Sequence, residues 1–404
     1  MSESQEKPKK ISTEPYKGVR DFYPADMAVQ NFIFDAWRKT AASFGYEEYG
    51  ASVLEPADLY KAKSGEEIVN EQTYTFTDRG EREVTLRPEM TPTVARMVSA
   101  RRRELVFPLR WYSIPNLFRY EQPQRGRVRE HWQLNVDLFG VDSIEADVEV
   151  ISLAYQVMKN FGAKDEDFEI RVNSRDLLRK IFMGKLKNED DLSKAVRLLD
   201  RREKMKPAEF DAAMKELTTG PLDLGISTDE KVDKILASFS KLGVSNIRFS
   251  PTLARGFDYY TGIVFEIYDT NPANRRALFG GGRYDDLTSL FGGEKIPAVG
   301  FGMGDVTIRD FLETRGLLPK TIAPADYYIC VMGQDEAAFA EKTAKTLRDK
   351  GSRVAVDFTY KKIGDQIKSA DKRGIPNVIV IGAEEAKSGK VKVKNLATGE
   401  EKEL

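Results

Sequence analysis

Residues 253–266 carry a dense group of side chains capable of chemistry in this chain of 404 residues. The segment reads LARGFDYYTGIVFE. Arg255 and Asp258 come directly before a stretch from Tyr259 to Ile267 that we expect to be a buried strand. Burying a guanidinium is costly unless a partner compensates it. A ligand that meets Arg255 and an internal Arg255–Asp258 ion pair both satisfy this requirement, and the segment alone leaves both open.

A second group of polar residues lies on two predicted strands joined by a polar loop. Gln133, Asn135 and Asp137 are two residues apart and therefore share one face of the second strand, while the leucines and valine between them point to the other face. Arg119 and Glu121 have the same spacing at the end of the first strand. Such a sheet offers a polar floor for a ligand, although an antiparallel sheet with one solvent-exposed face gives the same pattern.

An acid and a hydroxyl, Glu89 and Thr91, follow Pro88 at a predicted junction between a strand and a helix. A ligand role and a helix N-cap are both open for Thr91. Two glycine runs, at 280–282 and 300–304, allow either close approach of the backbone to a small ligand or tight strand packing. The first run lacks the lysine of a phosphate-binding P-loop, and the second lacks the spacing and βαβ context of a dinucleotide fingerprint.

The rare residue types restrict the chemistry. One cysteine, Cys330, and one histidine, His131, exclude a Cys/His zinc site and a disulfide framework within one chain. We assign His131 a structural or surface role, since no nucleophile-elbow motif accompanies it. Any catalytic chemistry must then use Arg, Asp, Glu, Gln and Tyr side chains, together with a magnesium ion that a nucleotide brings. The single cysteine fits a cytoplasmic protein, and no apolar run approaches the roughly 20 residues that cross a bilayer.

The order of predicted elements indicates two folded regions after a flexible tail of residues 1–15. Residues 16–322 begin with a helix over Asp26–Phe44 and continue with antiparallel strands, which indicates an α+β domain built on an antiparallel sheet. A largely helical insertion occupies about 177–242. Residues 326–404 alternate strand and helix, which predicts an α/β domain with a mostly parallel sheet. Strands of the first region are predicted over 46–54, 72–77, 83–86, 109–120, 132–139 and 168–172.

Several motifs of the first region occur in an informative order. They are Phe118-Arg119-Tyr120-Glu121, Arg255-Gly256-Phe257-Asp258-Tyr259-Tyr260, Gly281-Gly282-Arg283-Tyr284 and Gly300-Phe301-Gly302-Met303-Gly304. In this order the chain resembles class II aminoacyl-tRNA synthetases, and specifically the histidyl-tRNA synthetase family. The resemblance extends from Gly18 to the C-terminal region, and it implies a class II catalytic domain followed by an anticodon-binding-like domain.

This resemblance implies that the chain activates histidine with ATP to histidyl adenylate, releases pyrophosphate, and transfers histidine to the 3′ end of tRNA(His). It assigns the screening of charge at the α-phosphate to Arg119 and Arg255, and arginine suits this role because its planar fork binds phosphate bidentately. The other implied roles are ATP binding by Glu121, Gly302 and Gly304, binding of the α-ammonium group by Glu89, Thr91 and Gln133, and binding of the imidazole by Asp137, Tyr259 and Tyr260.

The same resemblance implies three partners, namely tRNA(His), a magnesium ion with ATP, and a second copy of the chain. We expect Arg125 and Arg127, in the loop between the two long strands, to contact the acceptor end of the tRNA. We expect a homodimer to form through the helix Asp26–Phe44 and the following strand. The sequence assigns no ligands to the magnesium ion.

The chain departs from the family pattern in three places. Thr307 stands where many members have an arginine that stacks on ATP, and Asp137 is one methylene shorter than the glutamate of bacterial relatives. The chain also stops at Leu404, before a final helix that many relatives have. One alternative is a non-catalytic regulatory paralogue of the kind that partners ATP phosphoribosyltransferase. Another is a synthetase for a different amino acid, which the Arg255–Tyr260 signature and the lack of zinc ligands disfavour.

Overall fold

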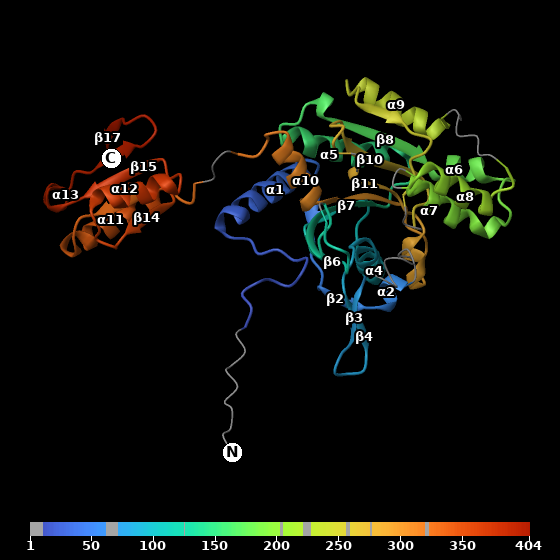
Figure 1. Ribbon diagram of the computed structural model, residues 1–404, viewed down its shortest axis with the longest axis horizontal. Coiled ribbons are helices and arrows are strands. Elements are labelled where there is room, and N and C mark those ends of the chain that lie inside the picture. Colours follow the sequence, from blue (N-terminus) through green and yellow to red (C-terminus); the bar gives the residue numbers. More distant parts are fainter. Residues whose placement is uncertain are drawn as a thin grey trace, which may run out of the picture. The chain divides into compact units, whose positions relative to one another are not determined.

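The computed structural model divides the chain into two compact units, Met1–Leu318 and Pro319–Leu404 (Figure 1). The larger unit is built on a mostly antiparallel sheet, and the smaller unit has a separate sheet with parallel strands at its centre. The predicted α+β domain followed by an α/β domain is therefore confirmed. No helix in the described part of the chain is long and apolar enough to cross a membrane. The structure describes residues 11–61, 72–124, 126–202, 205–220, 228–255, 259–274, 277–319 and 323–404.

Nine strands of the described residues form the large sheet, in the order β1-β5-β7-β12-β11-β10-β8-β9 with β6 paired to β7. All neighbours are antiparallel except β1 with β5 and β8 with β9, which are parallel. The strands are β1 (Glu47–Glu48), β5 (Leu109–Ser113), β6 (Asn116–Phe118), β7 (Glu130–Phe139), β8 (Phe168–Ser174), β9 (Ile247–Phe249), β10 (Ile263–Asp269), β11 (Ala277–Arg283) and β12 (Ala298–Gly304).

One face of this sheet is apolar and covered by helices. Leu134, Val136 and Leu138 of β7 are at most 1% exposed and belong to the main hydrophobic core, as their alternation predicts. Burial of apolar surface stabilises such a core by roughly 25 cal/mol per Å². The helices with side chains in this core are α1 (Pro24–Ser43), α5 (Ile144–Asn160), α9 (Glu230–Lys241) and α10 (Asp305–Thr314) (Figure 1).

Helix α1 shows why its sequence folds against the sheet. Ile33, Trp37 and Ala41 recur every four residues, and all three are fully buried. The helix begins with Pro24, whose missing N–H costs nothing in the first turn. It ends before Gly45, which has φ +77° and is the predicted stop.

The opposite face of the sheet is polar, and helix α4 (Thr91–Arg101) packs at one end of it with the 3₁₀ helix η4 (Leu287–Phe291). A three-stranded sheet precedes α4 in the chain, in the order β2-β4-β3. Its elements are β2 (Leu54–Pro56), helix α2 (Asp58–Lys61), β3 (Tyr74–Thr77) and β4 (Glu83–Leu86).

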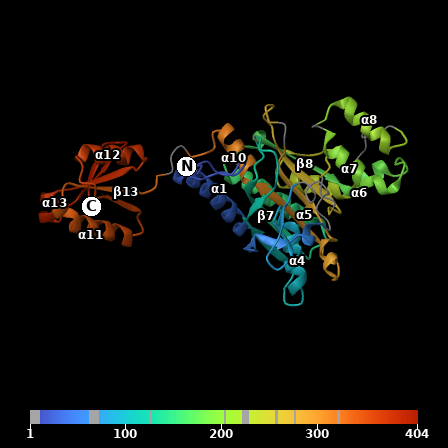
Figure 2. The ribbon, with the colours of Figure 1, turned by 60° about the horizontal axis from the view of Figure 1, so that its bottom comes forward.

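Three further helices form a module with its own core beside β8, and both Figure 1 and Figure 2 show them grouped there. They are α6 (Arg175–Phe182), α7 (Leu192–Asp200) and α8 (Pro207–Leu217). Helix α9, which falls within the predicted insertion of about 177–242, instead places Val232, Ile235 and Phe239 in the main core. Its apolar stripe packs on α5 and β8, so the module with a separate core is shorter than the predicted insertion.

Three predicted strands differ from the structure by a break or by more than two residues at one end. The stretch 46–54 is not one strand, because β1 pairs with the large sheet and β2 with the small one. The stretch 109–120 is interrupted at Ile114-Pro115, although β5 and β6 pair with β7 in the same register on both sides. Proline has no N–H for the ladder, which explains the break. The strand predicted from Tyr259 begins only at Ile263.

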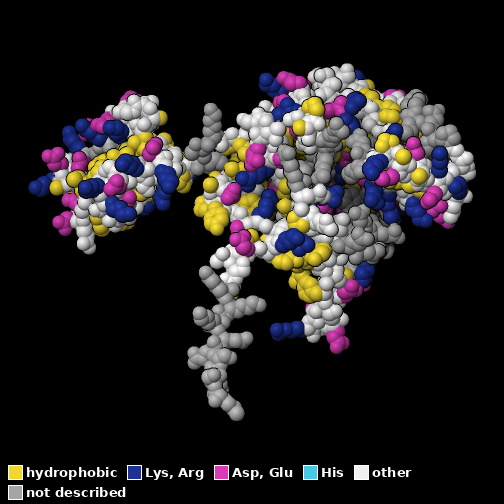
Figure 3. Space-filling view, in the orientation of Figure 1, with side chains coloured by type: hydrophobic (Ala, Val, Ile, Leu, Met, Phe, Trp, Pro, Cys, Tyr) yellow, Lys and Arg dark blue, Asp and Glu magenta, His cyan; other side chains and the backbone are white. Residues whose placement is uncertain are grey.

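The C-terminal unit contains a five-stranded sheet in the order β14-β13-β15-β16-β17. Three of its strands, β13 (Tyr327–Val331), β14 (Val354–Asp357) and β15 (Asn377–Ile381), are parallel, as predicted, and α11 (Ala337–Asp349) and α12 (Ile363–Lys372) connect them. Helix α13 (Ala383–Ser388) leads to the antiparallel pair β16 (Lys392–Asn395) and β17 (Glu401–Glu403), which the sequence pattern did not predict. Basic and acidic side chains are interspersed over the visible face of both units (Figure 3).

Candidate active site

A small cavity of about 120 Å³ lies on the polar face of the large sheet. It brings together both predicted catalytic arginines, every residue predicted to bind histidine, and Gly302. The cavity lies over β7, β11 and β12 because side chains along a strand alternate between the two faces of the sheet, so the polar residues of β7 face away from the core. The lining residues are Glu89, Thr91, Arg119, Gln133, Asn135, Asp137, Arg255, Tyr259, Tyr260, Gly280, Tyr284, Gly300, Phe301 and Gly302.

The two glycine runs make room for these side chains. Gly280 pairs with Gly302 across β11 and β12, and Gly300 pairs with Asp137 of β7. A Cβ atom at Gly300 would lie 2.5 Å from Oδ1 of Asp137, and one at Gly302 would overlap the amide of Gln133. A Cβ atom at Gly280 would likewise overlap the guanidinium of Arg255. The glycines therefore allow polar side chains to lie flat on the sheet.

Arg255 is held by an acid from the floor. Its guanidinium donates a hydrogen bond of 2.9 Å to Glu266 of β10 and lies 5.6 Å from the centre of the Tyr260 ring. Burial acts to lower the pKa of Arg255, but Tyr260 and Glu266 outweigh it and raise the pKa above its ordinary value. The alternative partner, Asp258, lies outside the described residues. Arg255 thus presents a permanent positive charge to the cavity.

Arg119 enters the same cavity from the first residue after β6. Its Nε donates to the carbonyl oxygen of Pro88 at 2.9 Å, and its backbone N–H donates to the carbonyl oxygen of Arg129 at 2.9 Å. Neither bond uses the terminal nitrogens of the guanidinium. Two arginines in a cavity of this size favour an anionic group between them.

Asp137 has one oxygen bonded and one unbonded. Oδ1 accepts a hydrogen bond from the hydroxyl of Tyr284, whereas Oδ2 is buried without a hydrogen-bond partner among the described residues. Burial raises the pKa of Asp137 to about 7, against the opposing effect of the Tyr284 bond. A buried acceptor of this kind in a cavity wall is suited to an N–H donor of a ligand.

Glu89, Thr91 and Tyr259 form the next part of the wall. The hydroxyl of Tyr259 donates to Glu89 at 3.1 Å, and burial raises the pKa of Tyr259, so the phenol stays neutral. The rings of Tyr259 and Tyr260 lie 4.9 Å apart. Thr91 is the first residue of α4, and Met90 occupies the N-cap without a side-chain bond. The N-cap alternative for Thr91 is therefore wrong.

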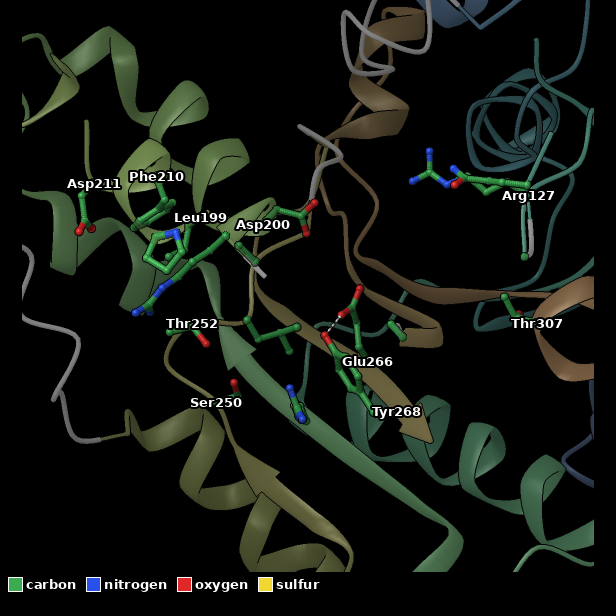
Figure 4. Close-up of a pocket in the computed structure, with 18 residues that line it drawn as sticks. Arg127, Leu199, Asp200, Phe210, Asp211, Ser250, Thr252, Glu266, Tyr268 and Thr307 are labelled. Carbon is green, nitrogen blue, oxygen red and sulfur yellow. Dashed lines mark hydrogen bonds between the residues drawn. The ribbon is translucent and has the colours of Figure 1, made fainter. Parts of the chain in front are cut away.

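Glu266, which pairs with Arg255 of the small cavity, lines a larger cavity of about 940 Å³. Arg127 and Thr307 lie on one side of this larger cavity, and Leu199, Asp200 and Phe210 of the helical module lie on the other (Figure 4). Between the two sides, the hydroxyl of Tyr268 donates to Glu266 at 2.6 Å. The second cavity therefore connects the floor of the sheet with the helical module.

The remaining predicted residues lie outside the small cavity. Arg127 and Glu121 form an ion pair of 3.5 Å, and Arg127 lines the larger cavity. Gly304 ends β12, and a Cβ atom there would be 4.0 Å from both His131 and Thr307. Arg125 lies outside the described residues.

Thr307 supplies no positive charge at the position where the resemblance implies an arginine stacked on ATP. Its hydroxyl donates to the carbonyl oxygen of Leu278 at 2.7 Å. His131 has a pKa lowered to about 3, by burial first and then by Arg119 and Arg20, so its imidazole is neutral. Of the two roles expected for His131, structural or surface, this burial favours the structural one.

Sequence reasoning assigned no role to Tyr284, although it lines the cavity and orients Asp137. The available signal was the Gly-Gly-Arg-Tyr motif, in which the tyrosine follows a buried Arg283. Asn135 was placed in the polar floor without a specific role, and its amide donates to the carbonyl oxygen of Gln133 at 3.1 Å.

The described residues contain no group of three or more His, Cys, Asp or Glu side chains placed to hold a metal ion. Their donor set does not fit a resident metal centre.

The comparisons with known proteins agree with this geometry. The family model for histidyl-tRNA synthetase matches residues 18–306, and the model for the anticodon binding domain matches residues 326–404. The chain belongs to the histidyl-tRNA synthetase family. The predicted family is thus confirmed, and the regulatory-paralogue alternative is not better supported than the enzyme.

Relatives in this family match along nearly the whole chain. Histidine–tRNA ligase of Leptospira biflexa is 42% identical over 417 residues, covering 97% of this chain and 95% of the relative. Histidine–tRNA ligase of Halobacterium salinarum is 40% identical over 412 residues, covering 95% and 94%. The apo structure of S. aureus histidyl-tRNA synthetase has a TM-score of 0.73 at 26% identity and covers 97% of both chains. The structure of histidyl-tRNA synthetase from Nostoc sp. PCC 7120 has a TM-score of 0.82 at 23% identity, covers 98% of this chain and 97% of that one, and supports the fold.

Proposed function

We propose that this chain is a histidine–tRNA ligase, which activates histidine with ATP and transfers the histidyl group to the 3′ end of tRNA(His). The observation that carries this proposal is that Arg119 and Arg255 line one small cavity with Gln133 and Asp137. The full-length similarity to proteins named histidine–tRNA ligase supports it.

In the first step, a carboxylate oxygen of histidine attacks the α-phosphorus of ATP, and pyrophosphate leaves. Negative charge builds on the non-bridging oxygens of that phosphorus, and the guanidiniums of Arg119 and Arg255 offset it. Both side chains are held before the substrate arrives, Arg119 by Pro88 and Arg255 by Glu266, so little reorganisation is needed. Positioning of the two reactants supplies the rest of the acceleration.

Selection of histidine uses the buried polar groups of the small cavity. Oδ2 of Asp137 accepts the imidazole N–H, and the hydroxyl of Tyr260 meets the other ring nitrogen, with Tyr259 beside it. Glu89, Thr91 and Gln133 hold the α-ammonium group. An amino acid without the two ring nitrogens leaves these groups unpaired, which reduces its use by roughly 10⁴-fold.

In the second step, a hydroxyl of the terminal ribose of the tRNA attacks the carbonyl carbon of the adenylate, and AMP leaves. The larger cavity offers the space for this approach, with Arg127 at its side. We place Glu121, Gly302 and Gly304 at the nucleotide, Arg125 and Arg127 at the acceptor end, and the C-terminal unit at the anticodon. The match of residues 326–404 to an anticodon binding domain supports the tRNA partner.

The setting of the reaction belongs to the same proposal. Magnesium arrives as the counter-ion of the triphosphate, and the reaction takes place in the cytoplasm. The chain forms a homodimer through α1 and the strands that follow it. The half-exposed apolar face of the small sheet, with Leu54, Pro56 and Phe76, supports such an interface. Light scattering should then give twice the mass of 45.7 kDa of one chain.

The decisive test is histidine-dependent ATP–pyrophosphate exchange with magnesium present. Arg255→Ala should reduce the exchange rate by roughly 10²- to 10³-fold, because it removes one of the two charges at the α-phosphate. The matched control is Arg248→Ala, since Arg248 also pairs with an acid of the sheet, Glu169, but is 58% exposed and lines neither cavity. Absence of histidine-dependent exchange in the unaltered protein would refute the proposal.

A further inference from the structure

An extended segment near the N-terminus, Tyr16–Phe22, packs against the loop that carries Glu121 and Arg127. We call it the N-terminal strap. It contains no helix or strand, so contacts with other parts of the chain determine its position. The strap takes no part in the proposed reaction steps. Its contacts nevertheless converge on the start of β7 and on the ends of the loop that carries Glu121 and Arg127.

Arg129 is the centre of these contacts. Its backbone N–H donates to the carbonyl oxygen of Gly18 at 2.7 Å, and its guanidinium donates to the hydroxyl of Tyr16 at 2.8 Å. The same guanidinium donates through Nε to the carbonyl oxygen of Glu121 at 3.1 Å and lies 4.0 Å from the centre of the Tyr120 ring. Arg129 is only 8% exposed, so it is not a free surface charge for tRNA, unlike its neighbour Arg127.

Gly18 allows the strap to touch this arginine. It has φ +90°, and a Cβ atom there would lie 2.8 Å from the side chains of both Arg129 and Pro123. Pro123 belongs to the loop itself, between Glu121 and Arg127. A larger residue at position 18 would therefore push on the loop as well as strain the backbone.

A second anchor holds the other end of the strap. Arg20 donates to the buried carboxylate of Asp305 at 2.8 Å, and the same carboxylate accepts the backbone N–H of Trp132 at 2.9 Å. The ring of Phe22 packs edge-on against Trp132, with 5.2 Å between ring centres. The strap is thus tied to both β7 and α10, and it cannot shift without moving its contacts with Arg129.

We infer that the N-terminal strap is a positioning element for the nucleotide end of the site. The strap acts through Arg129, which bonds to two residues of the nucleotide end. The backbone N–H of Arg119 donates to the carbonyl oxygen of Arg129, and the guanidinium of Arg129 donates to the carbonyl oxygen of Glu121. The histidine end does not depend on it, because Glu89 and Asp137 are held by tyrosines from other elements. This inference rests on the proposed function.

The test compares two glycines that both have positive φ. Gly18→Ala introduces a Cβ into the contact with Arg129 and Pro123, whereas Gly45→Ala imposes a similar backbone strain at φ +77° with nothing within 4 Å. In the exchange assay, Gly18→Ala should raise the KM for ATP by about 10-fold or more and leave the KM for histidine within about twofold. Gly45→Ala should leave both KM values within about twofold.

A milder variant, Tyr16→Phe, removes the hydroxyl that accepts from Arg129 without straining the backbone. It should raise the KM for ATP by about threefold at an unchanged melting temperature. If Gly18→Ala does not fold, the result for Tyr16→Phe alone tests the inference. Equal rises in both KM values, or no rise for ATP in a folded variant, would overturn the inference. These outcomes leave the exchange activity of the unaltered protein in place, whereas loss of that activity would refute the proposed function itself.

Discussion

The two ends of the candidate site are built on different principles. The proposed histidine end is a cavity of about 120 Å³ whose polar groups are buried and mostly hydrogen-bonded within the protein. The proposed nucleotide and acceptor end opens into a cavity of about 940 Å³, and Arg127 beside it keeps 42% of its side chain exposed. Buried groups discriminate strongly between ligands because an unmatched partner leaves them unpaired, whereas exposed charges attract a polyanion with little discrimination.

This difference corresponds to the sizes of the proposed ligands. Histidine is small and must be distinguished from other amino acids, which requires fixed and desolvated partners. ATP and the end of a tRNA are large and highly charged, so attraction and positioning matter more than exclusion.

Asp137→Asn should reduce kcat/KM for histidine by about 10³-fold or more while changing the KM for ATP by less than about twofold. The amide keeps the shape of the carboxylate but loses the charged acceptor that the buried cavity offers to the imidazole N–H. Exchange kinetics with each substrate varied in turn measure both constants. Similar losses for both substrates would show that the two ends are not independent.

Gly302→Ala should raise the KM for histidine by about 10²-fold, because the added Cβ would overlap the amide of Gln133 and displace it. Gly304→Ala is the matched control, since its Cβ would meet nothing closer than 4.0 Å. Both glycines are placed at the nucleotide, so a rise in the histidine KM that is confined to Gly302→Ala would come from the displacement of Gln133. A histidine KM that is unchanged in Gly302→Ala would contradict the role of Gln133 at the α-ammonium group.

The KM for histidine should fall by about 10-fold between about pH 6 and about pH 8. Burial raises the pKa of Asp137 to about 7, so below that pH the carboxyl is protonated and cannot accept the imidazole N–H, and above it the ionised form can. Titration of free histidine contributes to the profile as well, and Asp137→Asn measures that contribution alone. Identical profiles for the two proteins would contradict an ionisable Asp137 at the imidazole.

Arg127→Ala should slow the charging of tRNA by about 5-fold and change the exchange rate by less than about twofold. Loss of one phosphate contact should also lower the salt dependence of charging, by about one unit in the slope of log rate against log salt. Aminoacylation measured over a range of salt concentrations provides both values. Equal losses in exchange and charging would mean that this loop serves ATP instead.

The polar floor could be predicted because a strand alternates strictly. Once Leu134, Val136 and Leu138 are assigned to the core, the neighbouring Gln133, Asn135 and Asp137 must face the other way, and the structure confirms this arrangement. The same reasoning could not identify the partner of Arg255. Glu266 lies on β10, and only the folded structure shows that its carboxylate meets the guanidinium of Arg255.

Other features depended on contacts between distant segments. Helix α9 has the composition of the neighbouring module, and only its packing on α5 places it in the main core. Arg129 belongs to a run of arginines that would usually be solvated, and only the strap makes it a buried hub. Local propensity contains no information about such contacts, since they form between residues far apart in the chain.

The amino-acid sequence by itself determined the chemistry available to this protein: two arginines and a set of acids, amides and tyrosines on alternating strands, with too few cysteines and histidines for a zinc site. The tertiary structure alone decided which of these groups meet, because burial and hydrogen bonding depend on the approach of β7, β10, β11 and β12. That approach is possible where Gly280, Gly300 and Gly302 omit a side chain, and it leaves one buried oxygen of Asp137 open to a ligand.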